Sequence, residues 1–273
     1  MKYSYKNLSN DQIERYLERI NYRNKVEVNE KCLSGLVDAH QKAIIFENLD
    51  IYFEKRPVSL ELDDLFDKLV TRKRGGFCFE LNGLFVALLR SIGFDAWSCF
   101  CRVTMFEGEY FMPINHRGCI VKLDNLLYYC DVGFGGPMPG GALPIGEDGE
   151  HTIKDETYFT IDCGDGWKEM WRKSKVLKPD EAASEWVGKR ILRFSLNHTD
   201  PIDFIALCNY MARDESEFRT GYMVNYKRED GYYAISGRTL HINTSSQEFK
   251  KELETEDDAR IALKKYFGIS IKV

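Results

Sequence analysis

The sequence lacks the features that mark several classes of protein. No apolar run approaches the ~20 residues that span a bilayer, and residues 1–7 lack the apolar core of a secretory signal. No long basic run occurs, and 38 basic against 43 acidic side chains give a formal charge of -5. These absences argue against a membrane protein and against a protein that chiefly neutralises nucleic-acid phosphates. We therefore expect a cytoplasmic protein whose partners include neither membrane nor nucleic acid.

The sequence has eight cysteines but no Cys-x-x-Cys pair. Such pairs are typical of zinc sites, whereas Cys99-x-Cys101 lies in an apolar stretch that alternates like a strand. A chain that stays in a reducing compartment keeps its thiols reduced. We therefore expect no metal, and we expect most of the cysteines to pack as small core residues.

What the sequence does contain is typical of a globular protein. Of its 273 residues, 44% are hydrophobic and 13% aromatic, which excludes a disordered chain. The length is sufficient for a large core and fits two or three modules better than one.

The first third of the chain has helical patterns. Ser9 with Gln12 three residues later is typical of a capping box, and apolar residues at helical spacing follow it. A similar apolar stripe over residues 62–70 follows Ser59, a possible N-cap. These patterns assign residues 1–93 to a helical module.

One helix of this module begins at a cysteine. It is predicted from about Cys78 to Ile92, and Gly93 is a natural terminator. The N-terminus of a helix presents unpaired N–H groups and a partial positive charge, which favour a thiolate over a thiol. Gly75-Gly76 just upstream lets the backbone turn tightly. Cys78 is therefore a candidate for chemistry, although a cysteine in an apolar helix is more commonly an inert core residue.

The pattern changes to that of strands from residue 94 onward. Asp124-Asn125 separates two β-rich runs and is typical of a two-residue hairpin turn. Glycine and proline crowd together over residues 133–149, a length of loop that points to function. Helical and strand patterns then follow one another to the end. We assign residues 94–198 to a β-rich module and 199–273 to a mixed α/β module, which makes the fold class α+β.

The two-residue turn fixes which residues of the hairpin face each other. Leu123 then opposes Leu126, and His116 and Asp131 become diagonal neighbours on one face, with backbones roughly 7–8 Å apart. A three-residue loop would instead place them on opposite faces. The same register sends two cysteines to the other face, where we expect packing roles: Cys119 and Cys130.

A cysteine, a histidine and an aspartate are the set that a thiol nucleophile needs. The imidazole takes the thiol proton, and the carboxylate fixes the ring tautomer and stabilises the imidazolium. Cys78, His116 and Asp131 are the candidates for these roles. The remaining histidines have weaker cases, and we expect them to be structural or solvated: His40, His151, His198 and His241.

Three blocks of the sequence resemble the signatures of one enzyme family. Residues 74–83 (Arg-Gly-Gly-Phe-Cys-Phe-Glu-Leu-Asn-Gly) are similar to the nucleophile motif of the arylamine N-acetyltransferases. Residues 131–136 (Asp-Val-Gly-Phe-Gly-Gly) resemble their aspartate motif, and residues 46–50 (Phe-Glu-Asn-Leu-Asp) a third signature. His116 lies between the nucleophile and aspartate motifs, as in the family. Arg117-Gly118-Cys119 after it is more polar than is usual there.

The resemblance implies both a fold and a reaction. The fold would be a helical bundle, a β-barrel and a mixed α/β lid, the first two related to the papain-like cysteine enzymes. The reaction would be a two-step, ping-pong transfer from acetyl-CoA to an arylamine or arylhydrazine, without a metal. Cys78 would be the acetylated nucleophile, His116 its base and acid, and Asp131 the orienting carboxylate.

The resemblance also implies roles for residues around this set. Phe46 and Phe134 match positions that line the acceptor slot, and they would otherwise be core aromatics. Arg74 and Glu47 match a pair with a structural role near the site, where the alternative is an ordinary surface ion pair. Contacts with the coenzyme are expected from the glycine-rich loop and from the C-terminal segment 217–220: Gly133, Gly135, Phe218 and Thr220.

Other functions remain compatible with the same residues. An amide synthase that acts on a carrier-bound acyl chain would use the same nucleophile without acetyl-CoA. A thiol hydrolase or transglutaminase-like enzyme would share the three catalytic residues. A protein that only senses aromatic amines would have no need of all three.

Overall fold

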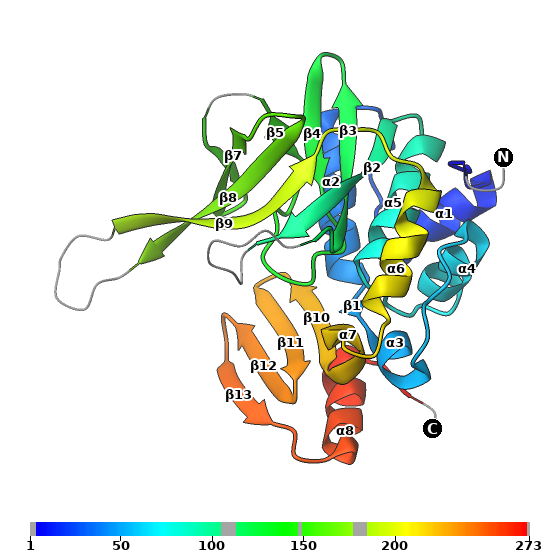
Figure 1. The fold of residues 1–273 in the computed structure, drawn as a ribbon, viewed down its shortest axis with the longest axis vertical. Coiled ribbons are helices and arrows are strands. Elements are labelled where there is room, and N and C mark those ends of the chain that lie inside the picture. Colours follow the sequence, from blue (N-terminus) through cyan, green and yellow to red (C-terminus); the bar gives the residue numbers. More distant parts are fainter. Residues whose placement is uncertain (1–3, 105–112, 147–148, 177–184, 272–273) are drawn as a thin grey trace.

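The protein has an α+β fold, as the resemblance implied (Figure 1). The computed structural model describes residues 4–104, 113–146, 149–176 and 185–271. These residues form helices and two antiparallel sheets, one of eight strands and one of five. None of the described helices combines the length and the apolar character needed to cross a bilayer.

The N-terminal third carries a group of helices. Their bounds are α1 (Asn10–Arg19), α2 (Glu30–Ala43), α3 (Leu49–Glu54), α4 (Leu62–Phe66) and α5 (Cys78–Ser91). The capping box predicted at α1 is confirmed, because Ser9 and Gln12 each accept a hydrogen bond from the other's backbone N–H. The helix α4 continues directly into a π-helical segment, Asp67–Thr71.

The expectation that Ser59 caps the helix over residues 62–70 was wrong. The N-cap of α4 is Glu61, which has an extended backbone. This extended residue keeps the Ser59 hydroxyl from reaching the N–H groups of the first helical turn. The hydroxyl instead donates to the Asp64 carboxylate at 2.5 Å and accepts from the N–H of Glu61.

The central helix of the molecule is α5. Every residue from Cys78 to Leu89 is buried, including the polar Glu80 and Asn82, so other elements enclose the helix on all sides. It packs against α1, α4 and two strands of the large sheet. Gly93 has a φ of +102°, the left-handed conformation predicted for the residue that ends this helix.

The large sheet is a nearly closed barrel. Its strand order is β5-β4-β3-β2-β9-β8-β7-β6, and the edge strands β5 and β6 lie against each other. The strands are β2 (Asp95–Val103), β3 (His116–Leu123), β4 (Leu126–Cys130), β5 (Leu143–Ile145), β6 (His151–Ile153), β7 (Glu156–Asp162), β8 (Trp167–Val176) and β9 (Glu185–Ser195).

The second sheet contains one short strand from the N-terminal third of the chain and four strands from the C-terminal third. The two-residue strand β1 (Phe46–Glu47) pairs with β10, so that Phe46 lies opposite Asn225. The sheet continues through β10 (Tyr222–Arg228), β11 (Gly231–Gly237), β12 (Thr239–Thr244) and β13 (Glu248–Glu252), and α8 (Glu256–Phe267) packs on it.

The link between the two sheets returns to the N-terminal helices. It consists of a 3-10 turn (Pro201–Phe204), α6 (Ile205–Met211) and α7 (Glu217–Thr220). Phe204 and Cys208 of this link pack against Phe77 and Phe79 at the start of α5. Figure 1 shows α6 running alongside α5 and α4. The start of α5 is therefore enclosed by segments from both ends of the sequence.

Candidate active site

Cys78 is the first residue of α5, as predicted. The preceding residue, Phe77, is the N-cap and has an extended backbone. Cys78 is 2% exposed, yet it lines a cavity of about 920 Å³. The thiol is therefore screened from bulk water but faces open space at the positive end of a helix.

The two glycines before Cys78 are needed for close packing. A Cβ on Gly75 would lie 2.3 Å from the carbonyl oxygen of Ile45, and one on Gly76 would lie 2.8 Å from a Glu80 carboxylate oxygen. Neither glycine has a positive φ. Gly75 is thus required by the close approach of residues 45–47, and Gly76 by the Glu80 carboxylate, whereas the sequence led us to expect a tight turn. A hydrogen bond from the N–H of Glu47 to the carbonyl oxygen of Gly76 joins the two segments.

The hairpin has the predicted register and brings His116 to Asp131. Leu123 pairs with Leu126, and Cys119 pairs with Cys130. His116 Nε2 lies 2.6 Å from Asp131 Oδ2, and both side chains are buried. The two cysteines lie in the helical core on the other side of the sheet, which confirms their packing role.

Two side chains that the sequence analysis did not assign hold the aspartate. Asn82 Nδ2 donates to Asp131 Oδ1 at 2.9 Å, and the Tyr129 hydroxyl donates to Oδ2 at 2.7 Å. The N–H of Gly133 also donates to Oδ1. The spacing of these residues could have indicated their roles. Asn82 is one helical turn after Cys78, and Tyr129 is two strand residues before Asp131, so each lies on the same face as a predicted catalytic residue.

The electrostatics of the site follow from these contacts. Burial alone would lower the pKa of His116, but the negative charge and hydrogen bond of Asp131 outweigh it, and the Cys78 thiol adds to them, so this pKa is raised well above its ordinary value. Burial likewise disfavours the Asp131 carboxylate, yet the His116 charge and the bonds from Asn82 and Tyr129 lower its pKa. Both shifts favour an imidazolium paired with a carboxylate.

A network of charged side chains supports the loop that carries the cysteine. Arg74 contacts Glu47 at 2.7 Å and Asp50 at 2.9 Å, and Lys68 contacts Asp50 and Glu80 at 2.8 Å each. Glu47, Lys68 and Glu80 are all buried. Glu80 also accepts the N–H of Phe77, directly before the cysteine. Arg74 and Glu47 thus form part of a desolvated network and not an isolated surface pair.

The cavity at Cys78 contains several of the other predicted residues. Phe46, Phe134, Gly135 and Phe218 line it together with His116. The Phe134 ring meets the His116 ring edge to face, with ring centroids 5.4 Å apart. Two predicted coenzyme contacts are not among the lining residues: Gly133, whose N–H is bound by Asp131, and Thr220, whose hydroxyl bonds to the Ser216 carbonyl.

The cysteines form no disulfide in the described part of the chain. All eight are free thiols, and seven of them are buried. No group of three or more His, Cys, Asp or Glu side chains within the described ranges is arranged to hold a metal ion. The donor sets of this part of the chain therefore do not form a metal centre.

Comparisons with known proteins agree on one family. The N-acetyltransferase family model matches residues 31–273. The arylamine N-acetyltransferase of Escherichia coli is 35% identical over 152 residues, so that the match spans about half of each chain (56% and 54%). That of Mycobacterium tuberculosis is 29% identical over 261 residues, which cover 94% of this chain and 88% of the relative.

A solved structure shares the whole fold. The arylamine N-acetyltransferase of Mycobacterium marinum, solved in complex with CoA, superposes with a TM-score of 0.81 at 30% identity and covers 94% of this chain and 92% of its own. The family match and this similarity extend well beyond the three sequence blocks. The chain belongs to the arylamine N-acetyltransferases, a family of acyltransferases.

Proposed function

We propose that this protein transfers an acetyl group from acetyl-CoA to the nitrogen of an arylamine or arylhydrazine through an acetyl-Cys78 intermediate. The observation that carries the proposal is that His116, which contacts the buried Asp131 at 2.6 Å, lines the same cavity as a cysteine at a helix start. This set is what a thiol nucleophile needs, and it is more than a binding protein for amines would require.

In the first half-reaction the donor acylates the enzyme. The Cys78 sulfur attacks the thioester carbonyl carbon of acetyl-CoA, and N–H groups at the start of α5, such as that of Cys78 itself, hold the oxyanion. The bond between this carbon and the coenzyme sulfur then breaks. The coenzyme leaves as a thiol after taking a proton from His116, and the acetyl group remains on Cys78.

In the second half-reaction the acceptor takes the acetyl group. An arylamine is weakly basic, so its nitrogen lone pair is free at neutral pH to attack the acetyl-cysteine carbonyl. His116 receives a proton from the nitrogen, and the Cys78 sulfur leaves as the thiolate. Because Asp131 binds Nε2, we assign both proton transfers to the Nδ1 atom of the ring.

The cavity is large enough for both substrates in turn. Its volume of about 920 Å³ and its aromatic side chains Phe46 and Phe134 suit a flat, apolar acceptor beside the cysteine. We propose Gly135 and Phe218 as the coenzyme contacts, since both line the same cavity. Gly133 and Thr220 stay predictions without such support.

Further proposals concern the organisation of the chain. We propose that residues 1–93, 94–198 and 199–273 are the bundle, barrel and lid, with β1 as the strand that ties the bundle to the lid. The free thiols fit an enzyme that works in the reducing cytoplasm. Arg74 and Glu47 position the Cys78 loop through the ionic network and do not contact substrate.

Mass spectrometry of the intact protein tests the proposed donor and nucleophile. Mixing with acetyl-CoA is expected to add about 42 Da, the mass of an acetyl group in place of a proton, at Cys78. An arylamine should then remove the adduct and appear as its N-acetyl product. Cys78→Ser should remain folded and form no adduct, and Cys163→Ser, which changes a half-buried thiol outside the cavity, is the matched control.

Three outcomes would contradict the proposal. An adduct that forms only with a longer, carrier-bound acyl thioester would favour the amide synthase. An adduct that water removes as fast as an arylamine does would favour a thiol hydrolase. Full turnover by Cys78→Ser would show that Cys78 is not the nucleophile.

A further inference from the structure

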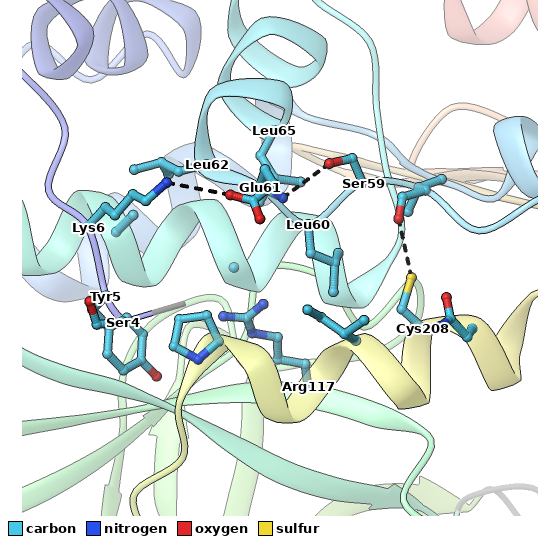
Figure 2. A pocket seen from close by; sticks show the side chains of 16 residues that line it. Ser4, Tyr5, Lys6, Ser59, Leu60, Glu61, Leu62, Leu65, Arg117 and Cys208 are labelled. Atoms are coloured by element: carbon cyan, nitrogen blue, oxygen red, sulfur yellow. Dashed lines mark hydrogen bonds and ion pairs between the residues drawn. The ribbon is translucent and has the colours of Figure 1, made fainter. Parts of the chain in front are cut away.

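A second cavity lies beside the middle of α5, where Gly83 and Ala87 line it. Its volume is about 250 Å³, and it shares no lining residue with the cavity at Cys78. Residues 4–6, the segment around α4, one face of α5, the 3-10 turn after β9 and α6 enclose it (Figure 2). We call it the Arg117 cavity, after the charged side chain at its centre.

The Arg117 side chain is a buried cation without a counter-ion. Arg117 is 2% exposed. Its Nε donates to Ser98 Oγ at 2.9 Å and its Nη1 to the carbonyl oxygen of Phe79 at 3.1 Å, both uncharged acceptors. Among the described residues no carboxylate forms an ion pair with it, and Nη2 makes no hydrogen bond. Burying an unpaired charge is costly, so this arrangement favours an anion that binds there.

The rest of the lining adds no net charge. Lys6 and Glu61 at the rim form an ion pair at 3.5 Å, so they offset each other. The walls are mainly apolar, with Leu60 and Leu65 on one side and Ile205 on the other. In Figure 2 the guanidinium group of Arg117 lies at the centre of the ring of lining side chains. The cavity therefore combines one positive charge with an apolar enclosure.

The Arg117 guanidinium occupies space beside α5 that is free because residue 83 is a glycine and has no side chain. A Cβ on Gly83 would lie 2.7 Å from Arg117 Nη1 and 3.1 Å from its Cζ, closer than side chains normally approach. On another side the Phe204 ring lies 4.5 Å from the guanidinium carbon and supports its face. The cation is thus held in place before any ligand arrives, which lowers the entropic cost of binding.

We propose that the Arg117 cavity is a binding site for a small monocarboxylate with an apolar body, whose carboxylate pairs with Arg117. A guanidinium matches a carboxylate in shape as well as in charge. A benzene ring fits an apolar cavity of about 150 Å³, so the volume found here holds a ring and its carboxylate. A larger or doubly charged ligand would exceed the space or the charge available.

The site lies one residue from the catalytic histidine. The carbonyl oxygen of Arg117 accepts a hydrogen bond from Asn82 at 2.6 Å, and the same amide group donates to Asp131. The Arg117 side chain also bonds to Phe79, the residue after the cysteine. A ligand on Arg117 would therefore be linked to Asn82 and Asp131 only through Arg117 itself, and it would lie outside the cavity at Cys78.

Calorimetric titration of the full chain with benzoate tests the proposal. We expect saturation at about 10 mM or below, in the range of weak small-molecule sites, and at least about tenfold weaker binding of the uncharged benzamide. Leu60→Trp, which fills the cavity from its wall, should abolish benzoate binding, and Arg117→Met should do the same. Ile261→Trp adds the same indole on exposed α8 and should bind benzoate as the parent does.

Further measurements separate this site from the active site and from loss of folding. Cys78→Ala should bind benzoate unchanged, and a crystal structure of the complex should show its carboxylate at Arg117. If Leu60→Trp or Arg117→Met does not fold, Ile205→Trp at the exposed rim replaces it. No saturation by benzoate, equal binding of benzamide, unchanged binding in a folded cavity variant, or benzoate found beside Cys78 would each overturn the proposal.

Discussion

Two buried histidines in this protein have opposite electrostatic surroundings. His116 lies against the Asp131 carboxylate, whereas His40 on α2 lies 2.7 Å from the Tyr16 hydroxyl and between the rings of Tyr16 and Phe85. Both side chains are 2% exposed or less. Burial raises the cost of a positive charge in both cases, and at His40 nothing offsets it, so the pKa of His40 is lowered to about 3.

The difference shows that the partner, and not the burial, decides the charge of a buried imidazole. At His116 the carboxylate outweighs burial and keeps the ring cationic. At His40 the Tyr16 hydroxyl and Nδ1 of a neutral ring share a hydrogen bond, so this histidine is a polar core residue. The same residue type thus has a proposed catalytic role in one region and a packing role in another.

The largest expected effect comes from removing the carboxylate that distinguishes the two regions. Asp131→Asn should lower kcat by about 10⁴-fold, as loss of the orienting aspartate does in other nucleophile sets. The pKa of His116 should fall, because the main contribution that opposes burial is then lost. Acetyl-transfer kinetics and NMR titration of the ring check both points.

Asp124→Asn is the matched control for this variant. It makes the same change in the exposed turn of the same hairpin, where Asn tolerates the positive φ of 52°. It should leave both activity and the His116 titration unchanged. Equal activity of the two variants would show that the carboxylate does not orient the histidine.

The next largest effect concerns a buried cation that shares its carboxylates with the Cys78 loop. Lys68→Met leaves Asp50 and the buried Glu80 with one fewer positive charge and should lower the free energy of unfolding by about 3–5 kcal/mol. Adding Glu80→Gln should recover part of this loss, because one unpaired carboxylate is then removed. Denaturant unfolding of both variants measures the effect.

Lys73→Met provides the comparison on the same loop. Lys73 is exposed, and within the described part of the chain its side chain makes no ion pair with the buried network. Its loss should therefore change the free energy of unfolding by less than about 0.5 kcal/mol. If Lys68→Met and Lys73→Met lowered the free energy of unfolding by similar amounts, the buried ion pairs of Lys68 would contribute no more to stability than an exposed lysine does.

A smaller effect is expected from the neutral histidine when the pH is lowered. Folded His40 takes up a proton only near pH 3, whereas in the unfolded chain it does so near its ordinary value of about 6.5. Between these values the unfolded state binds more protons, so stability falls as pH falls. The loss due to His40 should reach about 2 kcal/mol at pH 5.

His40→Gln should remove this part of the pH dependence while its amide oxygen still accepts from Tyr16. Urea unfolding at pH 7 and pH 5 measures the difference for the parent and the variant. His198→Gln, which changes an exposed histidine stacked on Trp97, is the control and should keep the parental slope. Identical slopes in the parent and His40→Gln would contradict the assignment of a neutral ring.

The smallest effect should come from removing one of the hydrogen bonds that the Asp131 carboxylate accepts. Tyr129→Phe removes the hydroxyl that donates to Asp131 and should cost about 1.5 kcal/mol in stability, with a fall in kcat of about tenfold. Tyr128→Phe removes a hydroxyl from the next residue, on the opposite face, and should leave kcat unchanged. Unequal stabilities with equal kcat values would limit Tyr129 to a structural role.

Much of the site could be predicted because local rules decide it. The length of the turn at Asp124-Asn125 fixes the hairpin register, and the register brings His116 to Asp131. The start of α5 at Cys78 likewise follows from its apolar stripe and its terminal glycine. Each of these inferences spans only a few residues of chain.

What could not be predicted depends on contacts between distant segments. Gly75 is explained by the approach of residues 45–47 and Gly76 by the Glu80 carboxylate, whereas Ser59 lies two residues before the N-cap of α4, Glu61. The partners of Lys68 come from α3 and α5, which no periodicity relates. Secondary structure is readable from patterns of neighbours, whereas the buried charges are set by the tertiary fold.

The pairing of β1 with β10 also has a consequence for the order of folding. Phe46 emerges early in synthesis, but its strand partner Asn225 lies 179 positions later in the sequence. Closing so long a loop carries a high entropic cost and must await synthesis of the C-terminal sheet. The wall of the catalytic cavity is therefore completed late, so a nascent chain that has already formed the hairpin of His116 and Asp131 does not yet have a finished pocket.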